Sequence, residues 1–181
     1  MSSKIFRRLI VCLLVAGTIV MMTGCNKIME SWAYDYEPTV ESLRLYQNGT
    51  AVFKGEKYKY TKDENYINLS NKKEDLKLRY IIENGGMSLY SSSTYYAASD
   101  VTDGSIVGTW LQDNGWSFIF SETGEFSEEG IFFGHYSLDE DNRCIKLMYE
   151  DPVPDIYLYY TLDGKNLTIE YPWQMVPTES K

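Results

Sequence analysis

The sequence predicts an all-β protein, an antiparallel meander written as two similar halves of about five strands each. Tyrosine occurs 16 times and aromatic residues make up 15% of the chain, and aromatic rings pack well on the pleated surface of strands. Apolar and polar residues alternate over many short stretches that are separated by turn residues, which is the period of a strand. We expect the two halves either to close one barrel or to form two packed sheets, behind an N-terminal signal helix.

Two hairpin patterns carry the internal repeat, one at residues 57–69 and the other at residues 134–149. In each, apolar alternation leads into a charged turn and then resumes. An offset of 78 to 80 positions in the sequence aligns the two halves. The matched positions are Trp32 with Trp110, Tyr58 with Tyr136, Ile67 and Leu69 with Ile145 and Leu147, and Leu78 and Tyr80 with Leu158 and Tyr160. The alternative is that any two all-β segments with similar turns align this well.

The N-terminus has the three parts of a secretory signal in residues 1–24. Lys4, Arg7 and Arg8 come first, and an apolar run of about 14 residues follows before the small residues. A bilayer span needs about 20 apolar residues, so a plain membrane anchor is the weaker interpretation.

The signal ends in Met22-Thr23-Gly24-Cys25, which resembles the lipobox of bacterial lipoproteins. Small residues before the cysteine give a signal peptidase access to the backbone, and the Cys25 thiol can accept a diacylglycerol. The resemblance implies cleavage before Cys25, lipid attachment at Cys25, and an extracytoplasmic protein anchored to the bacterial cell membrane. Several acyl chains suffice for a stable anchor, because each buried methylene contributes about 0.8 kcal/mol.

The rest of the chain divides at changes in composition. Residues 25–40 are expected to be a tether with Trp32 as a buried anchor, and residues 41–90 the first meander. Residues 91–105 are rich in Ser, Thr, Ala and Asp, which indicates a linker. Residues 106–173 form the second meander and residues 174–181 a C-terminal tail. Tyr95 and Tyr96 interrupt the linker, as a short strand or a surface aromatic pair.

The second half also resembles the small lipocalin-like domains of bacterial lipoproteins. The resemblance rests on Gly108-Thr109-Trp110, the turn at Gly124, Gly134-His135-Tyr136, and a closing Asp163-Gly164 turn. It covers residues 108–171 well and residues 32–90 loosely, because no glycine lies two positions before Trp32. Too little chain follows Gly108 for a full lipocalin of about eight strands. The halves would therefore close one barrel of about ten strands together, or each would form a small sheet packed on the other.

Composition excludes several classes of function. The formal charge of −9 argues against nucleic acid held through its phosphates. Removal of Cys12 and modification of Cys25 leave Cys144 as the remaining thiol, so we expect no intramolecular disulfide. A single histidine, His135, excludes sites that need two imidazoles. We expect no cofactor and no metal, since the acidic turn at residues 139–142 lacks the spacing of a calcium loop.

No catalytic constellation stands out, so we expect a protein without enzymatic activity. The alternative is a hydrolase whose acid-base chemistry rests on carboxylates alone. Cys144 has no nearby base, and His135 is expected on the outer face of its strand. Tyr157 and Tyr159 alternate with an apolar face and form either a second buried face or an exposed aromatic stripe, which suits sugar or protein contacts. Tyr95, Tyr96, Tyr157 and Tyr159 are therefore the candidate ligand-binding residues.

Charge is divided unevenly between the halves. Residues 25–100 hold 10 basic and 11 acidic residues, whereas residues 101–181 hold 4 and 15. One interpretation is that the surface residues of the two halves drifted apart under the sole requirement of solubility. The functional interpretation is that the first half faces an anionic wall or membrane, and that the second faces outward or meets a cationic partner.

Together these features predict a non-catalytic binding or interaction module of the bacterial cell envelope. Its partners would be the membrane, through the lipid, and an envelope protein, a glycan or a small molecule. The alternative is a carrier that encloses a small apolar or aromatic ligand in one closed lipocalin-like barrel, since a barrel of about eight strands is just wide enough for one.

Overall fold

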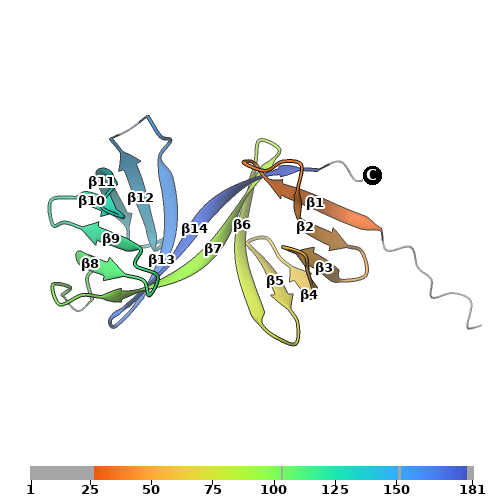
Figure 1. The fold of residues 1–181 in the computed structure, drawn as a ribbon, viewed down its shortest axis with the longest axis horizontal. Coiled ribbons are helices and arrows are strands. Elements are labelled where there is room, and N and C mark those ends of the chain that lie inside the picture. The colour runs from red at the N-terminus through yellow and green to blue at the C-terminus, as the bar shows by residue number, and fades with distance from the viewer. Residues whose placement is uncertain (1–26, 103, 151, 179–181) are drawn as a thin grey trace, which may run out of the picture.

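The computed structural model describes residues 27–178, apart from residues 103 and 151. It confirms the all-β antiparallel meander, because each strand pairs with the next one along the chain (Figure 1). The predicted signal segment and Cys25 lie outside the described residues. In the part of the chain that is described, no helix is long and apolar enough to cross a membrane.

The described residues form fourteen strands. The first seven are β1 (Ile28–Tyr34), β2 (Glu41–Tyr46), β3 (Thr50–Phe53), β4 (Glu56–Lys62), β5 (Tyr66–Ser70), β6 (Asp75–Glu83) and β7 (Gly86–Ala97). The second seven are β8 (Gly108–Leu111), β9 (Ser117–Phe120), β10 (Glu125–Glu128), β11 (Phe132–Asp139), β12 (Cys144–Tyr149), β13 (Ile156–Asp163) and β14 (Asn166–Pro177).

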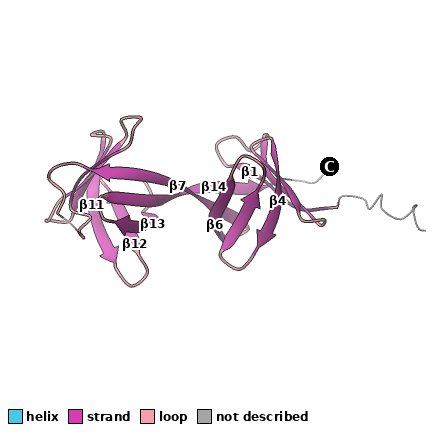
Figure 2. Ribbon diagram, turned by 90° about the horizontal axis from the view of Figure 1, so that it is seen from below, coloured by secondary structure: helices cyan, strands magenta, loops and turns pink. Residues whose placement is uncertain are grey.

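The strands close into a cycle through β1 and β14, and a further pairing of β7 with β14 divides this cycle. The extra pairing runs from Tyr96 opposite Asn166 to Met87 opposite Met175. Two closed cycles of strands therefore share one long ribbon made of β7 and β14. Figures 1 and 2 show the resulting two lobes, the first built on β1 to β6 and the second on β8 to β13.

Each lobe has its own hydrophobic core, and the ribbon supplies side chains to both. Side chains alternate between the two faces of a strand, and the odd-numbered residues of β7 and β14 face the cores. Leu89 of β7 and Met175 of β14 lie in the first core, whereas Tyr95 of β7 and Ile169 of β14 lie in the second. The interior is thus two filled cores, and the fourteen strands do not enclose one shared lumen.

The two lobes repeat the same ladder of strand pairs. Trp32 lies opposite Leu43, which lies opposite Phe53, and the second lobe has Trp110, Phe118 and Glu128 in the same places. The two strands of the ribbon also correspond to each other, because a residue of β7 matches the residue of β14 that is 80 positions later. Ser91 and Tyr171 form such a pair, and they lie opposite each other at the centre of the ribbon.

One of the matches predicted from the sequence is wrong by two residues. Tyr60 lies opposite Leu69 as Tyr136 lies opposite Leu147, so Tyr60 and not Tyr58 is the counterpart of Tyr136. The hydroxyls of both tyrosines donate to backbone carbonyls, of Tyr46 at 3.1 Å and of Ser121 at 2.7 Å. Sequence alignment missed the shift because Tyr58 and Tyr60 occupy the same face of the same strand.

The counterpart of Tyr58 is Gly134, and the loss of the large side chain is compensated by a larger residue on the neighbouring strand. Ala51 lies opposite Tyr58 in the first lobe, whereas Phe126 lies opposite Gly134 in the second. A Cβ atom at Gly134 would lie 2.8 Å from the Phe126 ring and 2.1 Å from a backbone oxygen. Each lobe thus places one ring and one small residue at this pair.

The expected segment boundaries need three corrections. The predicted linker at residues 91–105 is, up to Ala97, the second half of strand β7. The predicted tether contains β1, and β14 extends through Pro177 into the predicted tail. The serines of β7 gave no apolar alternation because they line the middle of the ribbon, between the two cores.

Candidate functional site

One open end of the second lobe holds a pocket of about 490 Å³, which we call the aromatic pocket. Strands β10 and β12 end there, β11 and β13 begin there, and the middle of the ribbon closes one side. It is lined by Ser91, Ser93, Tyr95, Gln112, Asn114, Trp116, Glu128, Glu129, Phe132, Tyr149, Val153, Ile156, Ile169, Tyr171 and Trp173. The pocket therefore lies where the core of the lobe meets solvent.

Aromatic rings form both the floor and the rim of the pocket. Tyr95 belongs to the buried core and packs edge-on against Phe118, with ring centroids 5.4 Å apart. At the rim, Trp116 is 51% exposed, Phe132 45% and Trp173 41%. Large aromatic side chains at such exposure form an apolar surface that a ligand can cover.

A buried carboxylate, Glu128, lies among these rings. It takes the inward-facing place opposite Phe118 in the β9–β10 ladder, and the residue is only 7% exposed. The Tyr149 hydroxyl donates a hydrogen bond to Glu128 Oε2 at 2.7 Å. Among the described residues that line the pocket, none is a lysine, arginine or histidine.

Burial perturbs the titration of this pair. It raises the pKa of Glu128, the hydrogen bond from Tyr149 partly opposes that rise, and the neighbouring Glu129 adds to it. The pKa of Tyr149 is also raised, by burial first and then by its hydrogen bond to Glu128. Both shifts have the sign expected when the charged form of a group loses water.

The turn between β10 and β11 fixes the second acidic residue. Glu129 and Gly130 both have positive φ, 59° and 65°, and Ile131 N–H donates to the Glu128 carbonyl at 3.1 Å. A non-glycine residue in this conformation is strained by about 1 kcal/mol or more. The Glu129 carboxylate accepts a hydrogen bond from the Ser117 backbone N–H, which aims it toward the pocket wall.

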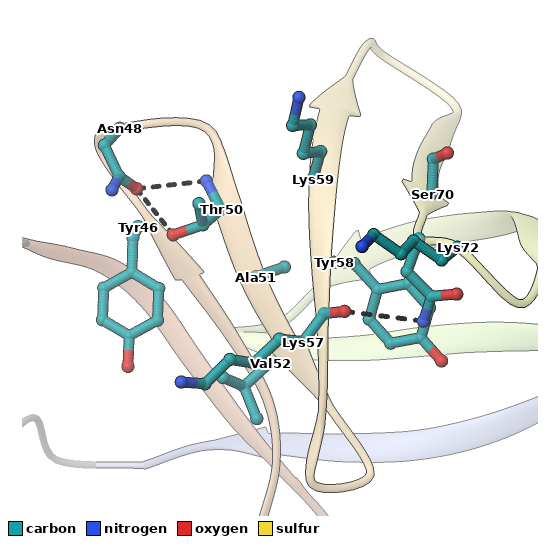
Figure 3. A pocket seen from close by; sticks show the side chains of 11 residues that line it. Tyr46, Asn48, Thr50, Ala51, Val52, Lys57, Tyr58, Lys59, Ser70 and Lys72 are labelled. Atoms are coloured by element: carbon teal, nitrogen blue, oxygen red, sulfur yellow. Dashed lines mark hydrogen bonds between the residues drawn. The ribbon is translucent and has the colours of Figure 1, made fainter.

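The first lobe has a groove of different chemistry. Figure 3 shows this groove of about 700 Å³, where Lys57, Lys59 and Lys72 border Tyr58 and Ala51. The lysine side chains are exposed. The groove is thus basic, whereas the aromatic pocket is acidic.

The four tyrosines predicted as ligand contacts are not brought together. Tyr95 lines the aromatic pocket, whereas Tyr96 is exposed on the opposite face of β7. Tyr157 and Tyr159 border a neighbouring surface pocket of about 630 Å³. Tyr157 is exposed, and Tyr159 is partly covered by the guanidinium of Arg79, 3.9 Å from its ring centroid, and by Tyr90.

The other candidates from the sequence are separate from the aromatic pocket. His135 is exposed on β11, and Cys144 is a buried free thiol whose pKa is raised by burial. In the acidic turn, Asp139 accepts hydrogen bonds from the backbone and side chain of Asn142. Among the described residues, no group of three or more His, Cys, Asp and Glu side chains is placed to hold a metal ion.

Sequence reasoning missed most of the residues that form the pocket. One signal was available at Glu128, because it stands two residues after Phe126 on the apolar side of an alternating strand. A carboxylate at a core-facing position is an exception to the binary pattern, and such exceptions concentrate at functional sites. Trp116 and Tyr149 gave no comparable signal, since an aromatic residue fits a core equally well.

We compared the chain with known protein families, curated proteins and solved structures. No protein family, curated protein or solved structure matches the chain. What the arrangement can do therefore follows from its chemistry: stack apolar groups on exposed rings, and accept hydrogen bonds or positive charge at two carboxylates.

Proposed function

We propose that the protein is a lipid-anchored, extracytoplasmic binding module of the bacterial cell envelope, and that the aromatic pocket is its ligand site. The observation that carries the binding role is the open pocket rimmed by Trp116, Phe132 and Trp173 with Glu128 buried beneath them. Concave sites with aromatic walls and a few placed polar groups are the usual form of small-molecule sites. The lipobox at residues 22–25 supports the anchor.

The fold supports an orientation for this module. The first described residues lead into β1, which belongs to the first lobe (Figure 1). The aromatic pocket lies in the second lobe. An anchor at Cys25 places the basic groove of the first lobe nearer the membrane, where lysines are attracted to anionic headgroups. The acidic second lobe then faces away from the surface.

Binding is favoured over catalysis by how the two carboxylates are held. Glu128 accepts from Tyr149, and Glu129 accepts from the Ser117 backbone. Neither has a histidine, cysteine or lysine beside it among the residues that line the pocket. A carrier that encloses its ligand in one barrel is less favoured, because two filled cores occupy the interior.

A fractionation experiment tests the anchor. Cys25→Ala should move the protein from the membrane fraction to the soluble extracytoplasmic fraction, because the thiol that accepts the lipid is gone. Cys144→Ala is the control and should stay in the membrane fraction. An unchanged distribution of Cys25→Ala would reject the anchor.

A thermal-shift screen tests the pocket with a matched pair of variants. Phe132 and Phe133 are neighbours on β11 with similar exposure, 45% and 49%, but only Phe132 lines the pocket. In a panel of envelope glycan fragments, muropeptides and small aromatic and ammonium compounds, a ligand should raise the melting temperature of the wild type and of Phe133→Ala. The same ligand should shift Phe132→Ala much less, and an equal shift in both variants would place binding elsewhere.

A further inference from the structure

The first lobe contains the structural counterpart of the aromatic pocket, and the two ends have opposite charge. The turn Lys54-Gly55 has positive φ at both residues, as Glu129-Gly130 has. Lys54 N–H donates to the Ser42 carbonyl at 2.8 Å, and Glu129 N–H donates to that of Ser117 at 2.9 Å. The strand ladders place Phe53 where the second lobe has Glu128. The pair Phe53-Lys54 is therefore replaced by Glu128-Glu129.

In the first lobe, the ammonium group of Lys54 lies near two aromatic rings. Lys54 Nζ is 5.3 Å from the ring centroid of Phe53 and 5.8 Å from that of Tyr34. Trp173 packs edge-on against Tyr34, with ring centroids 6.3 Å apart. These distances are within the range in which the negative face of an aromatic ring attracts a cation.

In the second lobe other aromatic rings line the pocket, and no cationic side chain is among its described lining residues. Tyr95, Tyr149 and Tyr171 line the pocket together with three rim aromatics, and no lysine, arginine or histidine is among the described lining residues. Two carboxylates stand where the first lobe has a phenyl ring and an ammonium. The site is thus built for positive charge that the chain itself does not supply there.

We propose that the aromatic pocket binds an organic cation, an ammonium group carrying small alkyl substituents, with the charge directed to Glu128 and the alkyl groups against the rings. This inference deepens the proposed function and rests on it. Cages of aromatic side chains are a recurring way in which proteins recognise quaternary ammonium groups, and a nearby carboxylate adds the attraction of an opposite charge.

The electrostatics of the second lobe support this ligand class over an anion or a neutral sugar. A buried carboxylate without a basic partner is unfavourable, and a bound cation supplies the missing charge. Residues 101–181 hold 15 acidic and 4 basic residues, and such a field attracts cations and repels anions before contact. A neutral sugar would use the rings but would leave the charge of Glu128 uncompensated.

Choline and its neutral isostere 3,3-dimethylbutan-1-ol form a direct test, because they differ by one charge at almost the same shape. Binding of each to the full-length protein in an uncharged maltoside detergent is measured by isothermal titration calorimetry. We expect choline to bind at least tenfold more tightly than the isostere. Glu128→Gln should lose at least tenfold in choline affinity, whereas Glu125→Gln, on the outer face of the same strand, should bind as the wild type does.

The outcomes separate this inference from the proposed function. Equal binding of choline and the isostere would overturn the cation inference and leave an apolar binding site. Choline binding that survives Glu128→Gln would also overturn it, and the melting temperature of this variant shows whether it is folded. Absence of binding by either probe, together with a ligand from the thermal-shift screen that depends on Phe132, would reject the cation and retain the binding module.

Discussion

Arg79 and Tyr159 occupy the same place in the two lobes, and they stack on each other where the lobes meet. They differ by the offset of 80 that relates β6 and β7 to β13 and β14, and Arg79 Cζ lies 3.9 Å from the Tyr159 ring centroid. Arg79 Nε also donates to Glu170 Oε2 at 2.6 Å, whereas Tyr159 packs edge-on against Tyr90 at 5.4 Å. Tyr90 and Glu170 also differ by 80 and are counterparts. The ionic contact of Arg79 with Glu170 is therefore repeated as the aromatic contact of Tyr159 with Tyr90.

This junction predicts a stability cost that a surface ion pair does not share. Arg79→Met leaves Glu170 without its partner and uncovers Tyr159, and should lower the free energy of unfolding by about 2 kcal/mol. Lys73→Met breaks the exposed pair with Glu56 (3.4 Å) and should cost less than about 0.5 kcal/mol. Urea denaturation of both variants measures the difference, and equal costs would show that the Arg79 contacts do not stabilise the junction.

Gly134 should be among the least replaceable glycines, because of the ring opposite it and the strand beside it. A Cβ atom there would meet the Met148 carbonyl oxygen at 2.1 Å, so Gly134→Ala should destabilise by about 3 kcal/mol. Gly86 is the control, since its nearest neighbour is the Met175 carbonyl oxygen at 3.4 Å and its φ is not positive. We expect Gly86→Ala to change the free energy of unfolding by less than about 1 kcal/mol. A thermal unfolding series that ranks the two variants in the reverse order would contradict the packing described at Gly134.

Glu128 should destabilise the fold at neutral pH, which is the cost of a charged site. Its pKa is raised above the ordinary value of 4.5, so the folded state favours the protonated form. The stability from this preference is fully present below the pKa of the unfolded chain and is lost as pH rises through the folded pKa. Glu128→Gln resembles the protonated form and should therefore be more stable than the wild type near pH 7.

This stability difference should also depend on pH. In the absence of ligand, the advantage of Glu128→Gln should be small near pH 4 and should grow as the pH rises toward 7, in denaturant titrations at each pH. The exposed Glu125→Gln should show no such trend. An advantage that shrinks with rising pH would mean that the folded state favours the Glu128 carboxylate, against the environment described for it.

The fold class follows from the sequence because apolar and polar residues alternate along the strands, and because the turns between them carry Asn-Gly, Asp-Gly and charged residues. The hairpins at residues 57–69 and 134–149 are confirmed as the β4–β5 and β11–β12 pairs. The shared ribbon could not be found in this way. Ser91, Ser92 and Ser93 lie at its middle, between the two cores, where neither face needs an apolar residue, so the pattern there was that of a linker.

The candidate site was harder to predict than the fold because its residues come from strand ends and turns far apart in the chain. Tyr95 was singled out as an aromatic residue in a polar segment, and the structure places it in the pocket. Tyr159 was singled out by alternation alone, and its ring is used to join the lobes. Glu128 could have been found as a carboxylate on an apolar strand face, whereas the contrast with Phe53 depends on a register that only the structure supplies.

The four tryptophans give the most direct measurement of the central claim, that the aromatic pocket of the second lobe binds an organic cation. Trp116 and Trp173 line the pocket, whereas Trp32 and Trp110 are buried in the two cores. In a two-dimensional NMR titration of the indole N–H signals with choline, we predict saturable shifts for Trp116 and Trp173 and unchanged positions for Trp32 and Trp110. Unchanged signals from Trp116 and Trp173 at saturating choline, or shifts of the same size for 3,3-dimethylbutan-1-ol, would contradict the claim.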